Sequence, residues 1–178
     1  MHEEVLNPAQ QALLPLLAQF RREYYLVGGT AIALHIGHRR SVDFDMFKAT
    51  TINHKRNLDR IVAAGISHQV IRRVAEQMNL VVNGVKLTFF QYPFPIMPED
   101  KFKDVFRMPS LISLAAMKAY ALGRRSKWRD YVDLYFLLTR HFSLLEVVNK
   151  SIELIRWGHS PLIRSSGNGE FRLKLRSN

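Results

Sequence analysis

The stretch LVGGTAIALHIGHRRSVDFDMF, residues 26–47, constrains the fold more than any other part of the chain. The apolar run Tyr24–Val27 is typical of a buried strand, and it stops at Gly28 and Gly29. The next residues carry apolar side chains at helical spacing as far as Gly37, which favours a short helix that this glycine ends. SVDFDMF then alternates as a strand does. The stretch therefore predicts a strand, a glycine turn, a short helix and a second strand in that order.

The other segments complete a mixed α/β pattern. Asn83-Gly84 separates two runs rich in β-branched and aromatic residues, which is the strongest short-range signal for a hairpin. Residues 67–80, SHQVIRRVAEQMNL, fit either a helix or a strand. Periodicity predicts helices over residues 8–22, 51–64, 109–122, 127–141 and 143–157. Strands thus dominate the first half of the chain and helices the second, which indicates an α/β core with a helical carboxyl-terminal part.

Composition limits the classes of function. The 26 Lys and Arg residues exceed the 15 Asp and Glu residues, giving a net charge of +11. This excess favours an anionic partner such as nucleic acid, a nucleotide or an acidic protein, although a generally basic surface is the alternative. The absence of cysteine excludes disulfides, thiol catalysis and cysteine-ligated zinc. We expect a cytoplasmic protein without a membrane span, because no long apolar run or signal-peptide pattern occurs.

Asp43 and Asp45 are the first candidate site. Successive side chains of a strand point to opposite faces, so the two carboxylates share one face and Phe44 turns into the core. Carboxylates this close repel unless a cation lies between them, and Mg²⁺ prefers such oxygen ligands. Because Mg²⁺ also binds substrate phosphates, the pair predicts a nucleotide site, with surface ion pairing as the alternative.

The glycines supply the complementary half of this site. A strand that ends at Gly28 and Gly29 and leads into a helix presents unpaired amides, which attract phosphate. Thr30 is expected either to cap this helix or to donate to phosphate. Arg39 and Arg40 follow and are candidates to neutralise phosphate charge. The simpler alternative is an ordinary glycine turn.

Together with LISLAAMKAYALGRRSKWRDYVDLYFLL, residues 111–138, these features resemble the DNA polymerase β-like nucleotidyltransferase superfamily. More narrowly, they resemble the AbiEii/AbiGii-type nucleotidyltransferases, known mainly as toxins of bacterial toxin–antitoxin pairs. The resemblance covers roughly residues 20–145, and residues 157–178 fit no continuation of it. It implies a minimal polymerase β-like core with a mixed, twisted sheet flanked by helices, plus a helical carboxyl-terminal part.

The resemblance implies a domain order. We expect residues 1–105 to form the nucleotidyltransferase core and residues 106–157 to form helices that pack on it. Residues 158–178 are expected to be an irregular tail.

The resemblance also implies roles for individual residues. The implied nucleotide ligands are Gly28, Gly29 and Thr30, the implied metal ligands are Asp43 and Asp45, and the implied catalytic residues are Asp43, Asp45, Lys118 and Asp130. Lys118 matches the family's helical lysine near the phosphates, and Asp130 its carboxylate on the following helix. For Asp133, one turn further, we favour a structural role in which it pairs with neighbouring arginines such as Arg125 and Arg129.

One position departs from the superfamily pattern. A third acidic residue usually comes from a later strand beside the Asp-x-Asp strand. Alternation in GVKLTFF places Lys86, Thr88 and Phe90 on one face, so that Thr88 stands where this carboxylate is expected. A threonine neither serves as a base nor binds a cation strongly, which leaves catalysis open.

The expected function is Mg²⁺-dependent transfer of a nucleoside monophosphate from an NTP to an acceptor hydroxyl, with Mn²⁺ as a second candidate metal. The basic charge and the resemblance favour RNA as acceptor, at a tRNA 3′ end, and the resemblance implies a toxin with a cognate antitoxin. Two alternatives stay open. One is transfer to a protein or a small molecule, and the other is a catalytically silent NTP- or RNA-binding module.

Two further groups of residues have simpler interpretations. For His35 and His38 we favour a structural or solvent-facing role over zinc binding, because no third ligand lies nearby in the sequence. The aromatic residues Phe89, Phe90, Tyr92 and Phe94 are able to stack on bases, but we favour a place in the core.

Overall fold

The computed structural model describes residues 1–94, 96–123 and 127–158. Except for Gly158, which ends the last helix, the expected tail lies outside these residues, as does Arg125. In chain order the elements are a 3₁₀ turn (Glu3–Val5), α1 (Pro8–Ala18), β1 (Tyr25–Val27), α2 (Gly28–Ile36), β2 (Asp43–Lys48), α3 (His54–Ala63), β3 (His68–Val74), β4 (Gln77–Val82), β5 (Val85–Gln91), β6 (Asp100–Phe102), β7 (Phe106–Met108), α4 (Leu111–Leu122), α5 (Trp128–Arg140) and α6 (Leu144–Gly158).

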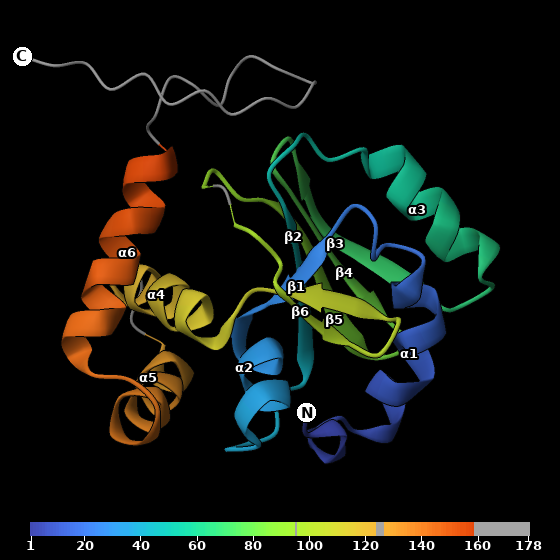
Figure 1. The fold of residues 1–178 in the computed structure, drawn as a ribbon. Helices are drawn as coiled ribbons and strands as arrows, with labels where there is room; N and C mark the ends of the chain where they lie inside the picture. The colour runs from blue at the N-terminus through green and yellow to red at the C-terminus, as the bar shows by residue number, and fades with distance from the viewer. Residues whose placement is uncertain (95, 124–126, 159–178) are drawn as a thin grey trace, which may run out of the picture.

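The main sheet has five strands in the order β1-β2-β5-β4-β3 (Figure 1). β2 and β5 run parallel, and every other neighbouring pair runs antiparallel. Figure 1 shows α1 and α3 on one side of this sheet and α4, α5 and α6 grouped on the other. The expected mixed α/β fold is therefore confirmed.

The hairpin signal at Asn83-Gly84 is also confirmed. Both residues have positive φ, 48° and 76°, as a two-residue hairpin turn between β4 and β5 requires. The ambiguous segment 67–80 forms β3 and the start of β4, which pair antiparallel. The β-branched run in QVIRRV thus prevails over helical spacing, because pairing with β4 satisfies its backbone.

One face of the sheet forms the core. Phe44, Met46, Leu87 and Phe89 are fully buried on it. The Phe89 ring centroid lies 5.0 Å from that of Phe20, in the segment between α1 and β1. Because this face is sealed by apolar side chains, the polar residues that alternate with them point to the other face, toward α4.

Three details differ from the sequence expectations. α1 ends at Ala18 rather than at residue 22, and turns follow it. The hairpin of β6 and β7 was not predicted, because its strands have only three residues each. The expected boundary after residue 105 falls inside that hairpin, and the domain division stays a prediction.

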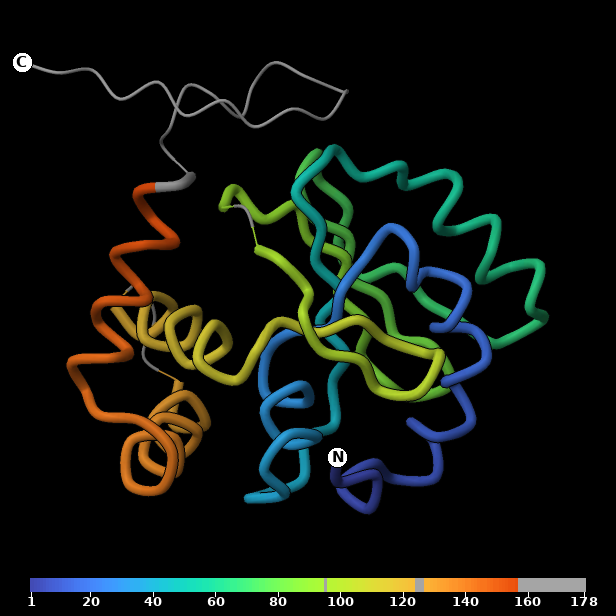
Figure 2. Tube along the Cα trace, in the orientation of Figure 1, coloured from blue at the N-terminus to red at the C-terminus, as the bar shows by residue number. Residues whose placement is uncertain are grey.

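The amino terminus lies beside α2 (Figure 2), where the His2 amide donates to the Leu34 carbonyl at 2.8 Å.

Replacing Phe44 by alanine tests whether β2 is anchored through its apolar face. The Phe44 ring is fully buried, with its centroid 5.6 Å from that of Phe106. We expect Phe44→Ala to lower the free energy of unfolding by about 3–5 kcal/mol in urea denaturation. Val42, 45% exposed just before β2, is the control, and Val42→Ala should change stability by less than about 0.5 kcal/mol. Equal losses in the two variants would contradict the assigned faces.

Candidate active site

A cleft of about 620 Å³ lies between the polar face of the sheet, the start of α2, and helices α4 and α5. The residues that line it include Gly28, Gly29, Arg39, Ser41, Asp43, Asp45, Gln77, Asn79, Lys86, Thr88, Lys118, Arg129 and Asp130. Segments far apart in the sequence therefore meet here. Most of the residues predicted to form a site line this one cleft, although the roles assigned to them stay predictions.

Asp43 and Asp45 lie on the cleft face of β2, on either side of the buried Phe44. Burial is the main cause that raises the pKa of Asp45, and the charge of Asp43 raises it further. The positive charges of Lys118 and Lys86 act in the opposite direction. Two carboxylates that repel each other at the base of a polar cleft offer the oxygen ligands that a divalent cation requires, so these residues fit Mg²⁺.

Thr88 lies where the sequence predicted it. β2 and β5 pair in a register that sets Thr88 beside Asp45 and Lys86 beside Asp43. A hydrogen bond with the Thr88 side chain lowers the pKa of Asp45. Among the described residues that line the cleft, Asp130 is the one acidic side chain besides the β2 pair. The polar face of β5 thus supplies a hydroxyl where a third carboxylate would stand.

Gly28 and Gly29 are the first residues of α2, which has no side-chain cap. Gly28 has a φ of +74°, and a Cβ there would overlap the Asp45 carboxylate. A Cβ on Gly29 would lie 2.5 Å from Arg39 Nη2 and 3.0 Å from Ser41 Oγ. The glycines therefore let the helix amino terminus approach Asp45 and Arg39 closely, and unpaired amides at such a terminus attract anions.

Thr30 corrects one expectation. The residue before α2 is Val27, so Thr30 does not cap the helix but lies within it. Its side chain is buried, and its hydroxyl donates to the main-chain carbonyl of Asp43. Thr30 therefore ties α2 to β2 instead of facing the cleft as a phosphate donor. Arg40 is exposed and is absent from the cleft lining, in contrast to Arg39.

Asp133 is the centre of a buried ion cluster, and its partners differ from the neighbouring arginines that the sequence predicted. Its carboxylate accepts from Arg39 Nε at 2.6 Å and Nη2 at 2.9 Å, and it contacts His38 Nε2 at 2.7 Å. Lys118 Nζ lies 2.9 Å from its other oxygen. Burial alone would raise the pKa of Asp133, but the bonds with His38 and Arg39 and the charge of Lys118 hold it well below its ordinary value.

This cluster corrects the expected partners of Asp133 and Arg39. Asp133 does have a structural role, but it pairs with side chains distant in the sequence, whereas Arg125 lies outside the described residues. Arg39 contacts Asp133 in a bidentate manner rather than projecting freely toward a phosphate. Its guanidinium still lines the cleft above Gly29. Sequence spacing carried no signal for a contact between residues 39 and 133.

Lys118 connects this cluster to the cleft. Its ammonium donates to Asp130 Oδ1 at 2.9 Å as well as contacting Asp133, and its side chain is 7% exposed. The same ammonium lies close enough to Asp45 to lower the pKa of that carboxyl. Lys118 therefore stands between the β2 carboxylates and the α5 carboxylates, in contact with the cleft.

The histidines and aromatic residues follow the simpler interpretations in part. The His38 side chain is buried in the Asp133 cluster, which is a structural role. Phe89, Tyr92 and Phe94 are buried. Phe90 lines the cleft with Tyr92 and with Phe47, whose ring centroid lies 5.0 Å from that of Phe90.

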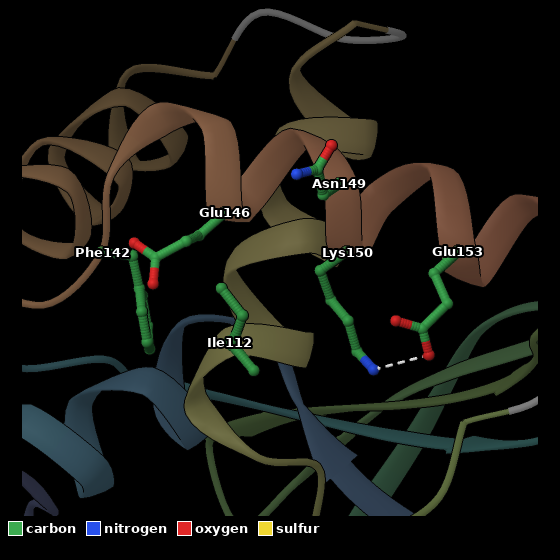
Figure 3. Close-up of a pocket in the computed structure, with 6 residues that line it drawn as sticks. All are labelled: Ile112, Phe142, Glu146, Asn149, Lys150 and Glu153. Carbon is green, nitrogen blue, oxygen red and sulfur yellow. Dashed lines mark hydrogen bonds and ion pairs between the residues drawn. The ribbon is translucent and has the colours of Figure 1, made fainter.

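A second hollow, of about 420 Å³, lies over α6 and the start of α4 (Figure 3). It is lined by Ile112, Phe142, Glu146, Asn149, Lys150 and Glu153. Figure 3 shows Lys150 and Glu153 turned toward each other, and their charged atoms lie 2.9 Å apart. The hollow shares no lining residue with the cleft, and its lining includes neither a glycine at a helix start nor an aspartate, so it lacks the features of the candidate site.

Comparison with known proteins confirms the resemblance seen in the sequence. Residues 91–176 match the family described as "Nucleotidyl transferase AbiEii toxin, Type IV TA system". This match extends beyond residue 145, so the expectation that residues 157–178 fit no continuation of the family pattern is wrong. The match begins after the Gly-Gly and Asp-x-Asp stretches, whose assignment therefore depends on the geometry of the cleft.

No described helix is long and apolar enough to cross a membrane.

Other proteins are similar to this chain at low sequence identity. An uncharacterized protein of Aquifex aeolicus, aq_aa25, is 28% identical over 138 residues, which cover 74% of this chain and 65% of that protein. The chain thus spans less than two thirds of this relative. MenT4, a nucleotidyltransferase toxin of Mycobacterium tuberculosis, superposes with a TM-score of 0.55 at 18% identity, covering 81% of this chain and 61% of MenT4.

The antibiotic-resistance factor ANT(2'')-Ia superposes with a TM-score of 0.60 at 13% identity, over 85% of this chain and 94% of that one. It has also been solved in complex with adenylyl-2''-tobramycin. At these identities, MenT4 and ANT(2'')-Ia show that they share a fold with this chain and show nothing more.

Two glycines with positive φ separate backbone strain from contact with the site. Gly65 has a φ of +66° with no atom within 4 Å of an added Cβ, whereas a Cβ on Gly28 would meet Asp45. We expect Gly65→Ala to cost about 1 kcal/mol, the strain of a left-handed residue. Gly28→Ala should cost at least about 2 kcal/mol more, because Asp45 or α2 must also move. Equal losses in chemical denaturation would contradict the close approach of Gly28 to Asp45.

Replacing Asp133 by asparagine tests the ion cluster. We expect a loss of about 3–5 kcal/mol at pH 7, because three buried basic groups lose their shared carboxylate. Since folding lowers the pKa of Asp133, its stabilisation is complete above the ordinary Asp pKa of about 4 and declines as pH falls below it. The difference between wild type and variant should therefore be constant above about pH 5 and shrink below about pH 4.

The exposed pair of Asp59 with Lys55 provides the control, and Asp59→Asn should cost less than about 1 kcal/mol. A difference between wild type and Asp133→Asn that grew as the pH fell would contradict this role.

Proposed function

We propose that this chain, whose resemblance to the AbiEii-type nucleotidyltransferases the family match confirms, transfers a nucleoside monophosphate from an NTP to an acceptor hydroxyl with the aid of Mg²⁺. The favoured acceptor is RNA at a tRNA 3′ end, in the cytoplasm, with the chain acting as the toxin of a toxin–antitoxin pair. The observation that carries the proposal is the meeting, in one cleft, of two repelling carboxylates and an uncapped glycine-rich helix terminus. The matched family and the shared fold support transferase activity.

The β2 carboxylates would hold the cation. Bound by Asp43 and Asp45, Mg²⁺ would neutralise phosphate charge and stabilise the charge that develops on the reacting phosphoryl group. Mn²⁺ prefers the same oxygen ligands and is the second candidate. The buried apolar face of β2 keeps both carboxylates in place, which matters because positioning dominates this class of reaction.

The helix terminus and the basic side chains would hold the triphosphate. The amides of Gly28 and Gly29 would donate hydrogen bonds to phosphate oxygens, and Arg39 and Lys118 lie within the same cleft. In the reaction the acceptor oxygen bonds to the α-phosphorus, and the bond from that phosphorus to the bridging oxygen breaks. Pyrophosphate then leaves beside these cations. The hydroxyl proton of the acceptor passes to solvent water, because Thr88 is not a base.

Two alternatives have specific support. The position of Thr88 beside Asp45 favours a module that binds NTP without turnover. The shared fold of ANT(2'')-Ia, solved with adenylyl-2''-tobramycin, favours a small-molecule acceptor. The net charge of +11 favours RNA over both a neutral and a cationic acceptor.

Labelled NTPs test the proposal directly. Incubation with each α-labelled NTP, Mg²⁺ and total tRNA should label RNA, and Asp45→Asn should slow labelling by about 10³-fold, because the cation loses a ligand. Asp59→Asn removes an exposed carboxylate on α3 and should leave the rate unchanged. Equal labelling by Asp45→Asn and wild type would contradict the site. Label in protein or in an aminoglycoside would support the other acceptors, and calorimetric NTP binding without labelling would support the silent module.

A further inference from the structure

The pairing of the strands places polar side chains in a row that runs from the cleft to the edge of the sheet. Asp45 pairs with Thr88 on β5, Thr88 pairs with Asn79 on β4, and Asn79 pairs with Arg72 on β3. Paired residues of neighbouring strands share a face, so these four side chains lie on the cleft face in a row across the strands. We call these four residues the transverse row.

Arg72 lies beyond the cleft at the outer end of this row. Asp45, Thr88 and Asn79 line the cleft, whereas Arg72 is on β3, the edge strand. The Arg72 side chain is exposed, and within the described residues it makes no ion pair. Its partner in register, Asn79, has its amide oxygen bonded by Gln77 Nε2 at 2.9 Å. An unpaired arginine continuous with a nucleotide-sized cleft attracts an anion.

The length of the row defines the ligand. Three strand spacings of about 4.8 Å put Arg72 roughly 14 Å from Asp45 along the sheet. A single acceptor nucleoside at Asp45 does not extend that far, whereas a strand of several nucleotides does. Lys86, also exposed on this face beside Asp43, adds a second positive charge near the row. The row therefore suits a polyanion that enters over β3 and ends at the carboxylates.

We infer that the transverse row is the track for a single-stranded RNA acceptor, with its 3′ end at Asp45 and an upstream phosphate on Arg72. This inference rests on the proposed function, and it specifies the acceptor as a polynucleotide that crosses β4 and β3. Asn79 offers a hydrogen-bonding amide to a sugar or base between the two ends. Binding along a backbone of this kind depends on salt and is largely independent of sequence.

The next residue along β3 provides a matched control. Arg73 is exposed as Arg72 is, but it pairs with the fully buried Met78 and so projects from the opposite face of the sheet. Arg72→Gln and Arg73→Gln therefore remove the same charge from adjacent positions of one strand. Only Arg72→Gln affects the cleft face.

The test measures binding of fluorescein-labelled single-stranded RNA, from one to about eight nucleotides long, to the full chain without NTP, by fluorescence anisotropy. For wild type, affinity should rise between one and about four nucleotides, because the longer strands extend to Arg72. Arg72→Gln should weaken binding of the longer strands about 3–10-fold and reduce the salt dependence by roughly one phosphate contact. Arg73→Gln should stay within about twofold of wild type.

The inference would be overturned if the two variants weakened binding equally, if neither did, or if wild type bound no RNA. The labelling assay distinguishes this failure from failure of the proposed function. RNA binding that depends on Arg72, with no labelling of any acceptor, would leave the track in place and reject the transferase. Labelling of RNA with an unchanged acceptor KM in Arg72→Gln would support the transferase and reject the track.

Discussion

The repulsion between Asp43 and Asp45 is the constraint on which the rest of the site depends. The period of a strand brings these carboxylates to one face, and the apolar side chains of Phe44 and Met46 fix that face by packing into the core. Nearby positive charges offset part of this repulsion. Lys118 and Lys86 lower the pKa of Asp45 without forming a direct ion pair with it in the described contacts. Two carboxyl groups at the base of the cleft thus remain available to a cation.

Asp133 has the opposite role, since it organises positive charge. By binding Arg39, His38 and Lys118, it connects the segment after α2 to α4 and α5. The cleft walls are therefore held together by one buried carboxylate, and two of its basic partners, Arg39 and Lys118, line the cleft. Of the two aspartates three residues apart on α5, Asp130 lines the cleft, whereas Asp133 binds the basic side chains behind it. This division explains why Asp133 is fully buried while Asp130 lines the cleft.

Local signals in the sequence predicted much of this structure. The turn at Asn83-Gly84, the helix end at Gly37 and the shared face of Asp43 and Asp45 follow from backbone preferences and strand alternation. Alternation also predicted Thr88 beside Asp45 once β5 was placed next to β2.

Contacts between distant segments could not be predicted in this way. The sequence gives no spacing rule for Arg39 with Asp133, or for Thr30 with the Asp43 carbonyl, because these depend on how α2 and α5 pack. The β6–β7 hairpin was not predicted, because strands of three residues are too short to show an alternating pattern of apolar and polar residues. The transverse row required the register of four strands, which only the folded sheet supplies.

A crystal structure of the chain with a non-hydrolysable NTP analogue and Mg²⁺ would show whether Asp43 and Asp45 bind the metal in the cleft. We expect a metal ion bound by Asp43 and Asp45, with the triphosphate at the amino terminus of α2 and beside Lys118. A nucleotide bound in the hollow over α6, or bound in the cleft with no metal at the two carboxylates, would contradict it.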